Sequence, residues 1–250
     1  MRKVGKVYIC GSGPGDPKLI TIKAIELLKK CDIVLYDRLV SKEIINQIPS
    51  KCERIYVGKS SDDPAIQQNK TNNLMVEHAK KGKKVLRLKG GDPFMFGRGG
   101  EEAEYLVQHN VKFEIVPGIT SAIGSGAYAG IPLTHRQFSS SVAFVTGHED
   151  PKKKEPTIRW EKLVKAVNTI VIFMGMEQLP YILNNLLKAG MRKNTQVAII
   201  ENGTTKEQRV IKSTLSNILK KAQEEKIKPP AIIIIGNVVS LHEKISWFNK

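Results

Sequence analysis

The sequence is poor in cysteine and in long apolar runs, and each shortage excludes a class of protein. Its three cysteines, Cys10, Cys31 and Cys52, form no CxxC pair and are odd in number, which argues against a disulfide framework and a thiolate zinc site. No apolar run approaches the ~18 residues of a membrane-spanning helix. The run from Val7 to Cys10 is far shorter than the apolar segment of a signal peptide. We therefore expect a cytoplasmic protein with no membrane partner.

Acidic and aromatic residues are also scarce. The chain has 40 Lys+Arg against 24 Asp+Glu, a formal net charge of +16, and a field of this sign attracts polyanions. An RNA-binding module would combine clustered basic residues with exposed aromatics, but aromatics make up only 6% and the basic residues are dispersed. This favours a small anionic partner over a nucleic acid. The five histidines show no HxxxH or HExxH spacing, so we expect no metal site.

Apolar runs of strand length alternate with segments of helical spacing along the 250 residues. The predicted strands are Lys6–Cys10, Ile33–Tyr36, Arg54–Val57, Lys84–Leu88, Lys112–Val116, Val142–Thr146, Thr169–Met174, Gln196–Ile200 and Ala231–Gly236. The predicted helices are Thr21–Lys30, Pro64–Lys81, Gly100–Asn110, Leu179–Ala189 and Leu215–Glu225. Such alternation predicts an α/β protein with largely parallel sheets.

A composition shift divides the chain. The segment PGITSAIGSGAYAGIP, residues 117–132, is dense in Gly, Ala and Ser and has a proline at each end, which is typical of a linker followed by a tightly packed helix of small residues. We therefore predict an N-terminal α/β domain over residues 1–116 and a C-terminal α/β domain over residues 117–250.

Two glycine-rich turns follow predicted strands. The first, Gly11–Pro17, has GxGPG spacing in place of GxGxxG, and Pro14 has no N–H to offer a pyrophosphate, so a dinucleotide site is disfavoured. The second, Lys89–Glu102, has five glycines in the eleven residues from Gly90, which is costly in chain entropy. Close approach of the backbone to a ligand explains that cost, with Asp92, Arg98 and Glu101 as polar contacts.

A set of strings in fixed order then resembles a known family. These are VYICGSGPGDP, YDRLVS, VGK, VLRLKGGDPFMFGRGGEE, VPGITSAIGSGAYAGIPLTHR, VTGH, MGM, ENGT and PAIIIIGNVVSL, from Val7 to Leu241. Together they are similar to the uroporphyrinogen-III C-methyltransferases. The resemblance implies the tetrapyrrole methylase fold, with two α/β domains and an active-site cleft between them, and a homodimer. The fused domains that some members carry have no room in this length, so we expect a monofunctional chain.

The resemblance also implies the reaction. Two molecules of S-adenosylmethionine (SAM) methylate uroporphyrinogen III at C2 and C7. The products are precorrin-2, which is an entry to sirohaem and cobalamin, and S-adenosylhomocysteine. The substrate carries eight carboxylates, which suits a strongly basic chain. The enzyme must align the methyl group with the carbon and accept a proton from the macrocycle.

Residue roles carried over from the family fall on matching positions. The expected SAM contacts are Pro14, Gly90, Gly91, Asp92, Met95, Thr120, Ser121, Met174 and Gly203. The expected acid–base residues are Asp37, Lys59 and Arg98, although an arginine stays protonated and is a poor base. The expected substrate contacts are Arg38, Arg98, Glu101, Arg136 and Met174. An alternative within the superfamily is methylation of a later precorrin or of the diphthine precursor.

Overall fold

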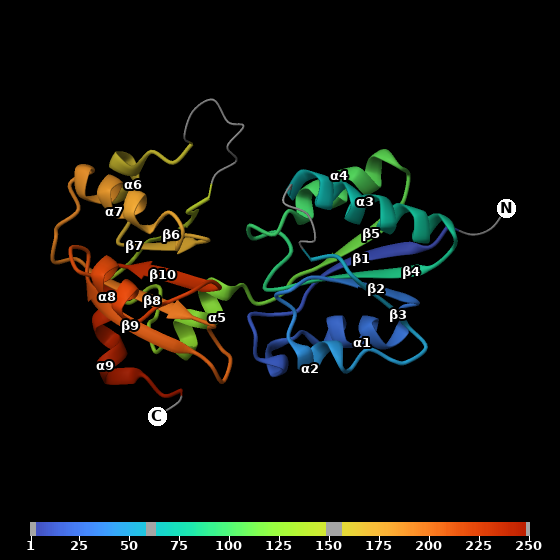
Figure 1. Ribbon diagram of the computed structural model, residues 1–250, viewed down its shortest axis with the longest axis horizontal. Coiled ribbons are helices and arrows are strands. Elements are labelled where there is room, and N and C mark those ends of the chain that lie inside the picture. Colours follow the sequence, from blue (N-terminus) through green and yellow to red (C-terminus); the bar gives the residue numbers. More distant parts are fainter. Residues whose placement is uncertain (1–3, 59–63, 149–156, 249–250) are drawn as a thin grey trace. The chain divides into compact units, whose positions relative to one another are not determined.

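The computed structural model describes residues 4–58, 64–148 and 157–248, without the side chains of residues 64–66. The chain divides into two compact units, Met1–Ser121 (unit 1) and Ala122–Lys250 (unit 2), and each contains a five-stranded sheet (Figure 1). The predicted linker region, residues 117–132, contains helix α5 (Ser121–Tyr128), whose first residue is the last of unit 1.

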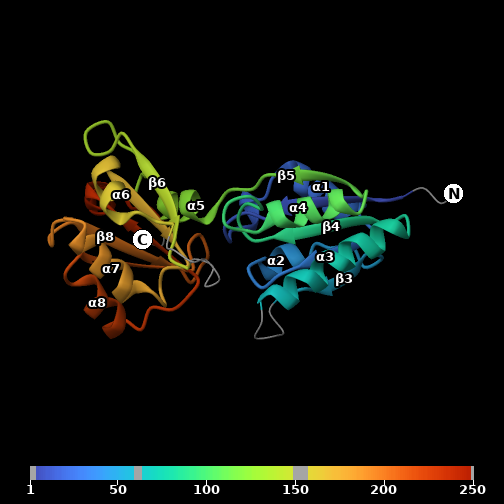
Figure 2. The same cartoon turned by 90° about the horizontal axis from the view of Figure 1, so that it is seen from above.

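The unit 1 sheet is wholly parallel. Its order is β3-β2-β4-β1-β5, so that β3 and β5 form its two edges (Figure 2). The strands are β1 (Lys6–Gly11), β2 (Ile33–Tyr36), β3 (Glu53–Tyr56), β4 (Lys84–Lys89) and β5 (Lys112–Val116). Because parallel strands run in one direction, their carboxyl ends meet at one edge of the sheet. The loops that follow β1, β2, β4 and β5 there are called the carboxyl edge.

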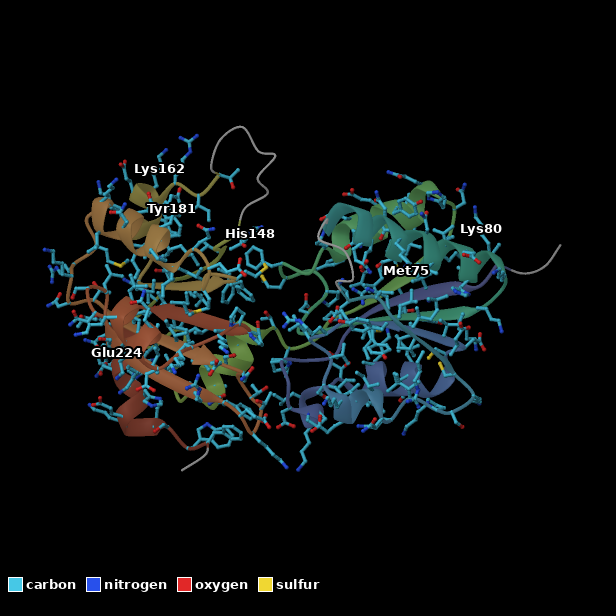
Figure 3. All side chains as sticks on the ribbon, in the orientation of Figure 1. Met75, Lys80, His148, Lys162, Tyr181 and Glu224 are labelled. Atoms are coloured by element: carbon cyan, nitrogen blue, oxygen red, sulfur yellow. The ribbon has the colours of Figure 1, made fainter. Side chains whose placement is uncertain are left out.

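Helices cover both faces of this sheet, with α3 and α4 on one side and α1 and α2 on the other (Figure 1). They are α1 (Ile22–Lys30), α2 (Lys42–Ile45), α3 (Pro64–Lys80) and α4 (Gly99–Gln108), with a 3₁₀ turn at Pro17–Leu19. The helix predicted over Thr21–Lys30 begins one residue later, because Thr21 is its N-cap and its hydroxyl accepts a hydrogen bond from the N–H of Ala24 at 3.2 Å. Met75 of α3 is buried against the sheet, whereas Lys80 points to solvent (Figure 3).

The unit 2 sheet is mixed, and here the prediction of largely parallel sheets is wrong. Its order is β6-β7-β10-β8-β9, and only β6 and β7 run parallel. The strands are β6 (Val142–Thr146), β7 (Thr169–Phe173), β8 (Gln196–Glu201), β9 (Arg209–Thr214) and β10 (Ala231–Ile235). The apolar run Ile232–Ile235 reflects the central place of β10, which is buried on both faces, and burial does not depend on strand direction.

One face of the unit 2 sheet is covered by α6 (Trp160–Ala166), α7 (Leu179–Lys188) and α8 (Ile218–Glu224), whose apolar side chains form one core with the strands. The chain continues through a 3₁₀ segment at Asn237–Leu241 into α9 (His242–Ile245). Among the described helices of both units, none has the length and apolar character needed to cross a membrane.

Candidate active site

The turns that follow β1 and β4 are joined backbone to backbone at the carboxyl edge. The N–H of Gly13 donates to the carbonyl of Gly91 at 3.2 Å, and the N–H of Gly91 donates back to the carbonyl of Gly13 at 2.7 Å. The N–H of Ser12 also donates to the carbonyl of Lys89 at 2.7 Å. The structure thus brings Pro14, which follows Gly13, to the same edge as the second glycine turn.

A third loop, after β5, packs against the same glycines. A Cβ atom built on Gly11 would lie 2.4 Å from the carbonyl oxygen of Gly91 and 2.8 Å from the Cα of Gly118. A Cβ on Gly118 would likewise lie 2.4 Å from the carbonyl oxygen of Gly91. The three backbones therefore approach one another more closely than any side chain permits, which explains glycine at these positions.

Asp92 fixes the shape of the second turn. One carboxylate oxygen, Oδ1, accepts hydrogen bonds from the N–H groups of Phe94 at 2.8 Å and Met95 at 3.1 Å. The other, Oδ2, accepts from the N–H of Gly118 at 3.0 Å. Both oxygens are engaged within unit 1, so the Asp92 side chain organises the loop that presents Gly90, Gly91 and Met95.

Three of the predicted SAM contacts lie together at this edge. Gly91 has a φ of +68°, and a Cβ there would lie 3.6 Å from the amide nitrogen of Ser121 and 3.9 Å from the Cα of Thr120. This packing is ordinary, so the left-handed backbone is what favours glycine at residue 91. The turns around Gly13, Gly91 and Gly118 present backbone donors and acceptors with little side-chain bulk, and we call them the glycine cradle. Such a cradle fits a cofactor that is bound largely by backbone groups.

A cluster of four charged side chains lies beside the cradle. Arg87 and Lys89 occupy alternate positions of β4 and therefore share one face of the sheet, while Glu102 comes from α4 and Asp37 follows β2. Arg87 donates from Nε to Glu102 Oε1 at 3.1 Å and from Nη2 to Asp37 Oδ2 at 3.2 Å. Lys89 Nζ donates to the same Glu102 oxygen at 3.0 Å, as does Gln68 Nε2 at 3.2 Å.

Burial and charge act against each other in this cluster. Glu102 is fully buried, which opposes its ionisation, but Arg87 and Lys89 outweigh that cost and lower the pKa of its carboxyl. Burial lowers the pKa of Lys89, and Arg87 adds to this effect, against the opposing influence of Glu102. Ser41 Oγ and Glu102 Oε2 are the two buried side-chain polar atoms in the described part of the chain that make no hydrogen bond.

Arg98 and Glu101 form an exposed pair at the start of α4. Arg98 donates from Nε to Glu101 Oε1 at 3.0 Å and from Nη2 to Oε2 at 2.7 Å. Arg98 adopts a left-handed backbone with φ 58°, as does Phe96 with φ 53°, which is uncommon for residues with side chains and is typical of functional sites. The predicted substrate contact Arg38 is exposed beside Asp37, and Lys59 lies outside the described residues.

In unit 2, the predicted ligand residues lie in tight turns. Met174 directly follows β7, has a φ of 53° and leaves 52% of its surface exposed. Its neighbour Gly175 meets the turn after β6, since a Cβ on Gly147 would lie 2.5 Å from the Cα of Gly175. A large, strained and exposed methionine after a buried strand is a better candidate for a ligand contact than for a core residue.

The other predicted residues of unit 2 lie in two further loops. Gly203 follows β8 and packs against α5, because a Cβ there would lie 2.0 Å from Ser125 Oγ. Arg136 is exposed within a short loop whose ends, His135 and Ser139, exchange two backbone hydrogen bonds of 2.8 Å.

Comparison with known proteins identifies the family. Residues 6–219 match the Tetrapyrrole (Corrin/Porphyrin) Methylases. The chain belongs to this family. The chain is 52% identical over 239 residues to the S-adenosyl-L-methionine-dependent uroporphyrinogen III methyltransferase of Methanosarcina barkeri, covering 96% of this chain and 94% of that protein. It is 50% identical over 237 residues to the uroporphyrinogen-III C-methyltransferase of Priestia megaterium, covering 95% and 99%.

Two further relatives are a longer protein and a protein whose crystal structure has been solved. The chain is 50% identical to the sirohaem synthase of Thiobacillus denitrificans over 98% of its own length, but it spans only 50% of that longer protein. A crystal structure of the Thermus thermophilus uroporphyrin-III C-methyltransferase complexed with S-adenosylhomocysteine superposes with a TM-score of 0.82 at 37% identity, covering 95% of this chain and 100% of that one.

Arg87, Lys89 and Glu102 were not among the site residues predicted from the sequence. A signal was present, because two basic residues alternate with leucine in an otherwise apolar strand, VLRLK. Alternate positions of a strand share a face, so these cations had to be buried with partners or exposed at an edge. Their anionic partner, Glu102, comes from a helix 13 to 15 residues away in the chain, and its identity required the fold.

Proposed function

We propose that this protein is a uroporphyrinogen-III C-methyltransferase, which transfers methyl groups from SAM to C2 and C7 of uroporphyrinogen III to give precorrin-2. The observation that carries the proposal is 52% identity to a Methanosarcina barkeri protein named for this activity, over 94% of that protein's length. The carboxyl edge supports it with a glycine cradle beside a buried charge cluster and the exposed Arg98–Glu101 pair.

The residues of the chain have distinct tasks in this reaction. When bound, SAM supplies an electrophilic methyl group on a sulfonium. The residues that bind this cofactor in the proposed reaction are Pro14, Gly90, Gly91, Asp92, Met95, Thr120, Ser121, Met174 and Gly203. Backbone groups suit this task, because they bind without side chains that would crowd the reacting carbon.

The substrate is held through its carboxylates. Arg38, Arg98 and Arg136 are exposed, and a guanidinium binds a carboxylate through two parallel hydrogen bonds. Glu101 orients the guanidinium of Arg98, and Met174 contacts the macrocycle. The excess of 16 positive charges draws a polyanionic substrate toward the protein.

Methyl transfer to a pyrrole carbon ends with loss of a proton from the macrocycle. Asp37 accepts that proton, since its carboxylate is partly exposed, with 24% of the side chain accessible. Lys59 is the second acid–base residue, and Arg98 acts as a cation near the substrate because it stays protonated. The enzyme works as a cytoplasmic homodimer, which sedimentation of the purified protein tests for the oligomeric state.

The experiment is an anaerobic incubation of the protein with SAM and uroporphyrinogen III, followed by mass measurement of the oxidised tetrapyrrole. A gain of two methyl groups supports the proposal. Methylation of a later precorrin, with no gain on uroporphyrinogen III, would assign the chain to another branch of the family. Equilibrium dialysis with labelled SAM provides an independent test of the cofactor cradle.

A further inference from the structure

We propose that Arg87 and Glu102 are positioning residues for Asp37, so that the buried charge cluster holds the proton-accepting carboxylate in a fixed orientation. The inference rests on the proposed function, because it takes Asp37 to be the proton acceptor. Neither Arg87 nor Glu102 reaches the surface: their side chains are 6% and 0% exposed. They act on the reaction only through Asp37.

The Asp37 carboxylate is held at both oxygens. Oδ2 accepts from Arg87 Nη2 at 3.2 Å, and Oδ1 accepts from the backbone N–H of Leu39 at 3.1 Å. These two donors, one from β4 and one from the chain after β2, prevent free rotation of the carboxylate. The part of the side chain that remains exposed is the part that a substrate can reach.

Arg87 is itself fixed at all three nitrogens of its guanidinium. Besides the bond to Asp37, Nε donates to Glu102 Oε1 at 3.1 Å and Nη1 donates to the carbonyl of Leu88 at 3.1 Å. A planar guanidinium with three acceptors has one orientation, which a lysine ammonium at the same position would not reproduce. Glu102 therefore fixes the orientation of Arg87, and Arg87 fixes the orientation of Asp37.

Glu102, which lies in α4, holds Arg87 in place through several hydrogen bonds of its own. Its Oε1 accepts from Arg87, Lys89 and Gln68, so the carboxylate is tied to β4 at two residues and to α3 at one. Burying the three charged groups of Arg87, Lys89 and Glu102 has a large desolvation cost, which apolar side chains of similar volume would avoid. Positioning a carboxylate at the carboxyl edge gives this costly cluster a role that apolar packing cannot provide.

The test is a double-mutant cycle with Arg87→Lys and Asp37→Asn, followed by kcat with saturating SAM and uroporphyrinogen III. In the otherwise native enzyme, we expect Arg87→Lys to lower kcat by about tenfold or more and to change KM by less than about threefold. In the Asp37→Asn background, the same change should alter kcat by less than about twofold, because there is no carboxylate left to position.

A residue that only supports the fold would behave differently. Equal losses from Arg87→Lys in both backgrounds, or a loss confined to KM, would overturn the inference. The matched control is Lys6→Met, which removes a half-buried cation paired with Glu114 at 2.5 Å near the start of β1, away from the carboxyl edge. We expect this control to leave kcat unchanged in both backgrounds.

Two further measurements cover the remaining outcomes. If Arg87→Lys does not fold, the cycle is run with Glu102→Asp, which retracts the anchor by one methylene, and additivity with Asp37→Asn would again overturn the inference. The same cycle on the urea midpoint tests the Arg87–Asp37 contact without the reaction, and additive shifts there count against it. If the native enzyme transfers no methyl group, the proposed function fails, whatever the urea cycle shows.

Discussion

The backbone of Gly11, at the end of β1, touches the carbonyl oxygen of Gly91, two residues after β4, so closely that a Cβ atom on Gly11 would lie 2.4 Å from that oxygen. This contact joins the two glycine-rich turns to which the resemblance assigns most of the cofactor contacts. A substitution that adds a side chain at Gly11 should therefore displace both turns.

Substitutions of three glycines in unit 1 should have graded effects on stability. Gly11→Ala has no room and should lower the free energy of unfolding by about 2 kcal/mol or more. Gly91→Ala has room but requires a left-handed alanine, which costs about 1 kcal/mol. Gly100→Ala, in α4 with no atom within 4 Å of the added Cβ, should stabilise by up to about 1 kcal/mol. Urea unfolding checks the order, and equal effects at all three positions would contradict the packing.

Arg98→Ala should reduce turnover by about a hundredfold or more, while the affinity for S-adenosylhomocysteine stays within about threefold. The reason is that Arg98 lies beyond the Gly90–Asp92 cradle and is proposed to hold a substrate carboxylate. The left-handed backbone is no new cost, because Arg98 already adopts it. Steady-state kinetics and calorimetry measure the two quantities. Arg192→Ala, at an exposed arginine of unit 2, is the control, and an equal loss of cofactor affinity in Arg98→Ala would reject the assignment.

The stability of unit 1 should depend on the ionisation of Glu102. Arg87 and Lys89 lower the pKa of this carboxyl despite its burial. A lowered pKa in the folded state means that the stabilisation is fully present above the ordinary value of 4.5 and is lost as the pH falls through the folded value. Glu102→Gln should cost about 3–5 kcal/mol at pH 7, since it leaves buried cations without their carboxylate. The difference from the native protein should shrink in acid.

Two variants serve as controls for that experiment. Glu77 also has a lowered pKa, through its hydrogen bond to Lys81, but its side chain is exposed, so Glu77→Gln should leave the unfolding curve nearly unchanged. Lys89→Met removes a cation whose burial lowers its pKa, and Glu102 keeps Arg87 as a partner. Lys89→Met should therefore lower the free energy of unfolding by less than Glu102→Gln does. A larger loss of stability from Lys89→Met than from Glu102→Gln would show that Glu102 is not the residue that holds the cluster together.

The three cysteines should be inert to alkylation in the folded protein. Burial raises the pKa of Cys10 to about 12, so at pH 8 only about one thiol in ten thousand is a thiolate. Burial, together with Cys52 at an Sγ–Sγ distance of 3.5 Å, also raises the pKa of Cys31. Mass analysis after iodoacetamide should find no label without urea and full label with it. Ser140→Cys adds a thiol at an exposed position as a positive control. Rapid native labelling of Cys10 would contradict the packing of unit 1.

Much of the fold was predictable from apolar patterning. The strands Ile33–Tyr36, Lys112–Val116 and Val142–Thr146 have their predicted bounds, because each holds β-branched and aromatic residues between clear breaks. The strand Arg209–Thr214 was not predicted, since an edge strand of partly exposed residues lacks such a run. The antiparallel directions in unit 2 also escaped prediction, because a buried strand has the same composition in either direction.

The candidate site divides in a similar way. Glycine turns at strand ends are visible in sequence, and the structure joins Gly13 to Gly91 and sets Gly91 beside Thr120 and Ser121. The pairing of Asp37 with Arg87 was not visible, because the two residues are 50 positions apart and meet only through the β2–β4 register. The role of Asp92 in shaping its own loop also required coordinates, since a turn aspartate is equally able to contact a ligand.

The most direct test of the account is the stoichiometry of methyl transfer by the purified chain under anaerobic conditions. We predict that each uroporphyrinogen III consumed gains two methyl groups while two molecules of S-adenosylhomocysteine appear, and that Asp37→Asn slows this conversion without comparable loss of substrate affinity. A tetrapyrrole recovered with its mass unchanged, from a protein that is folded and binds SAM, would contradict the account.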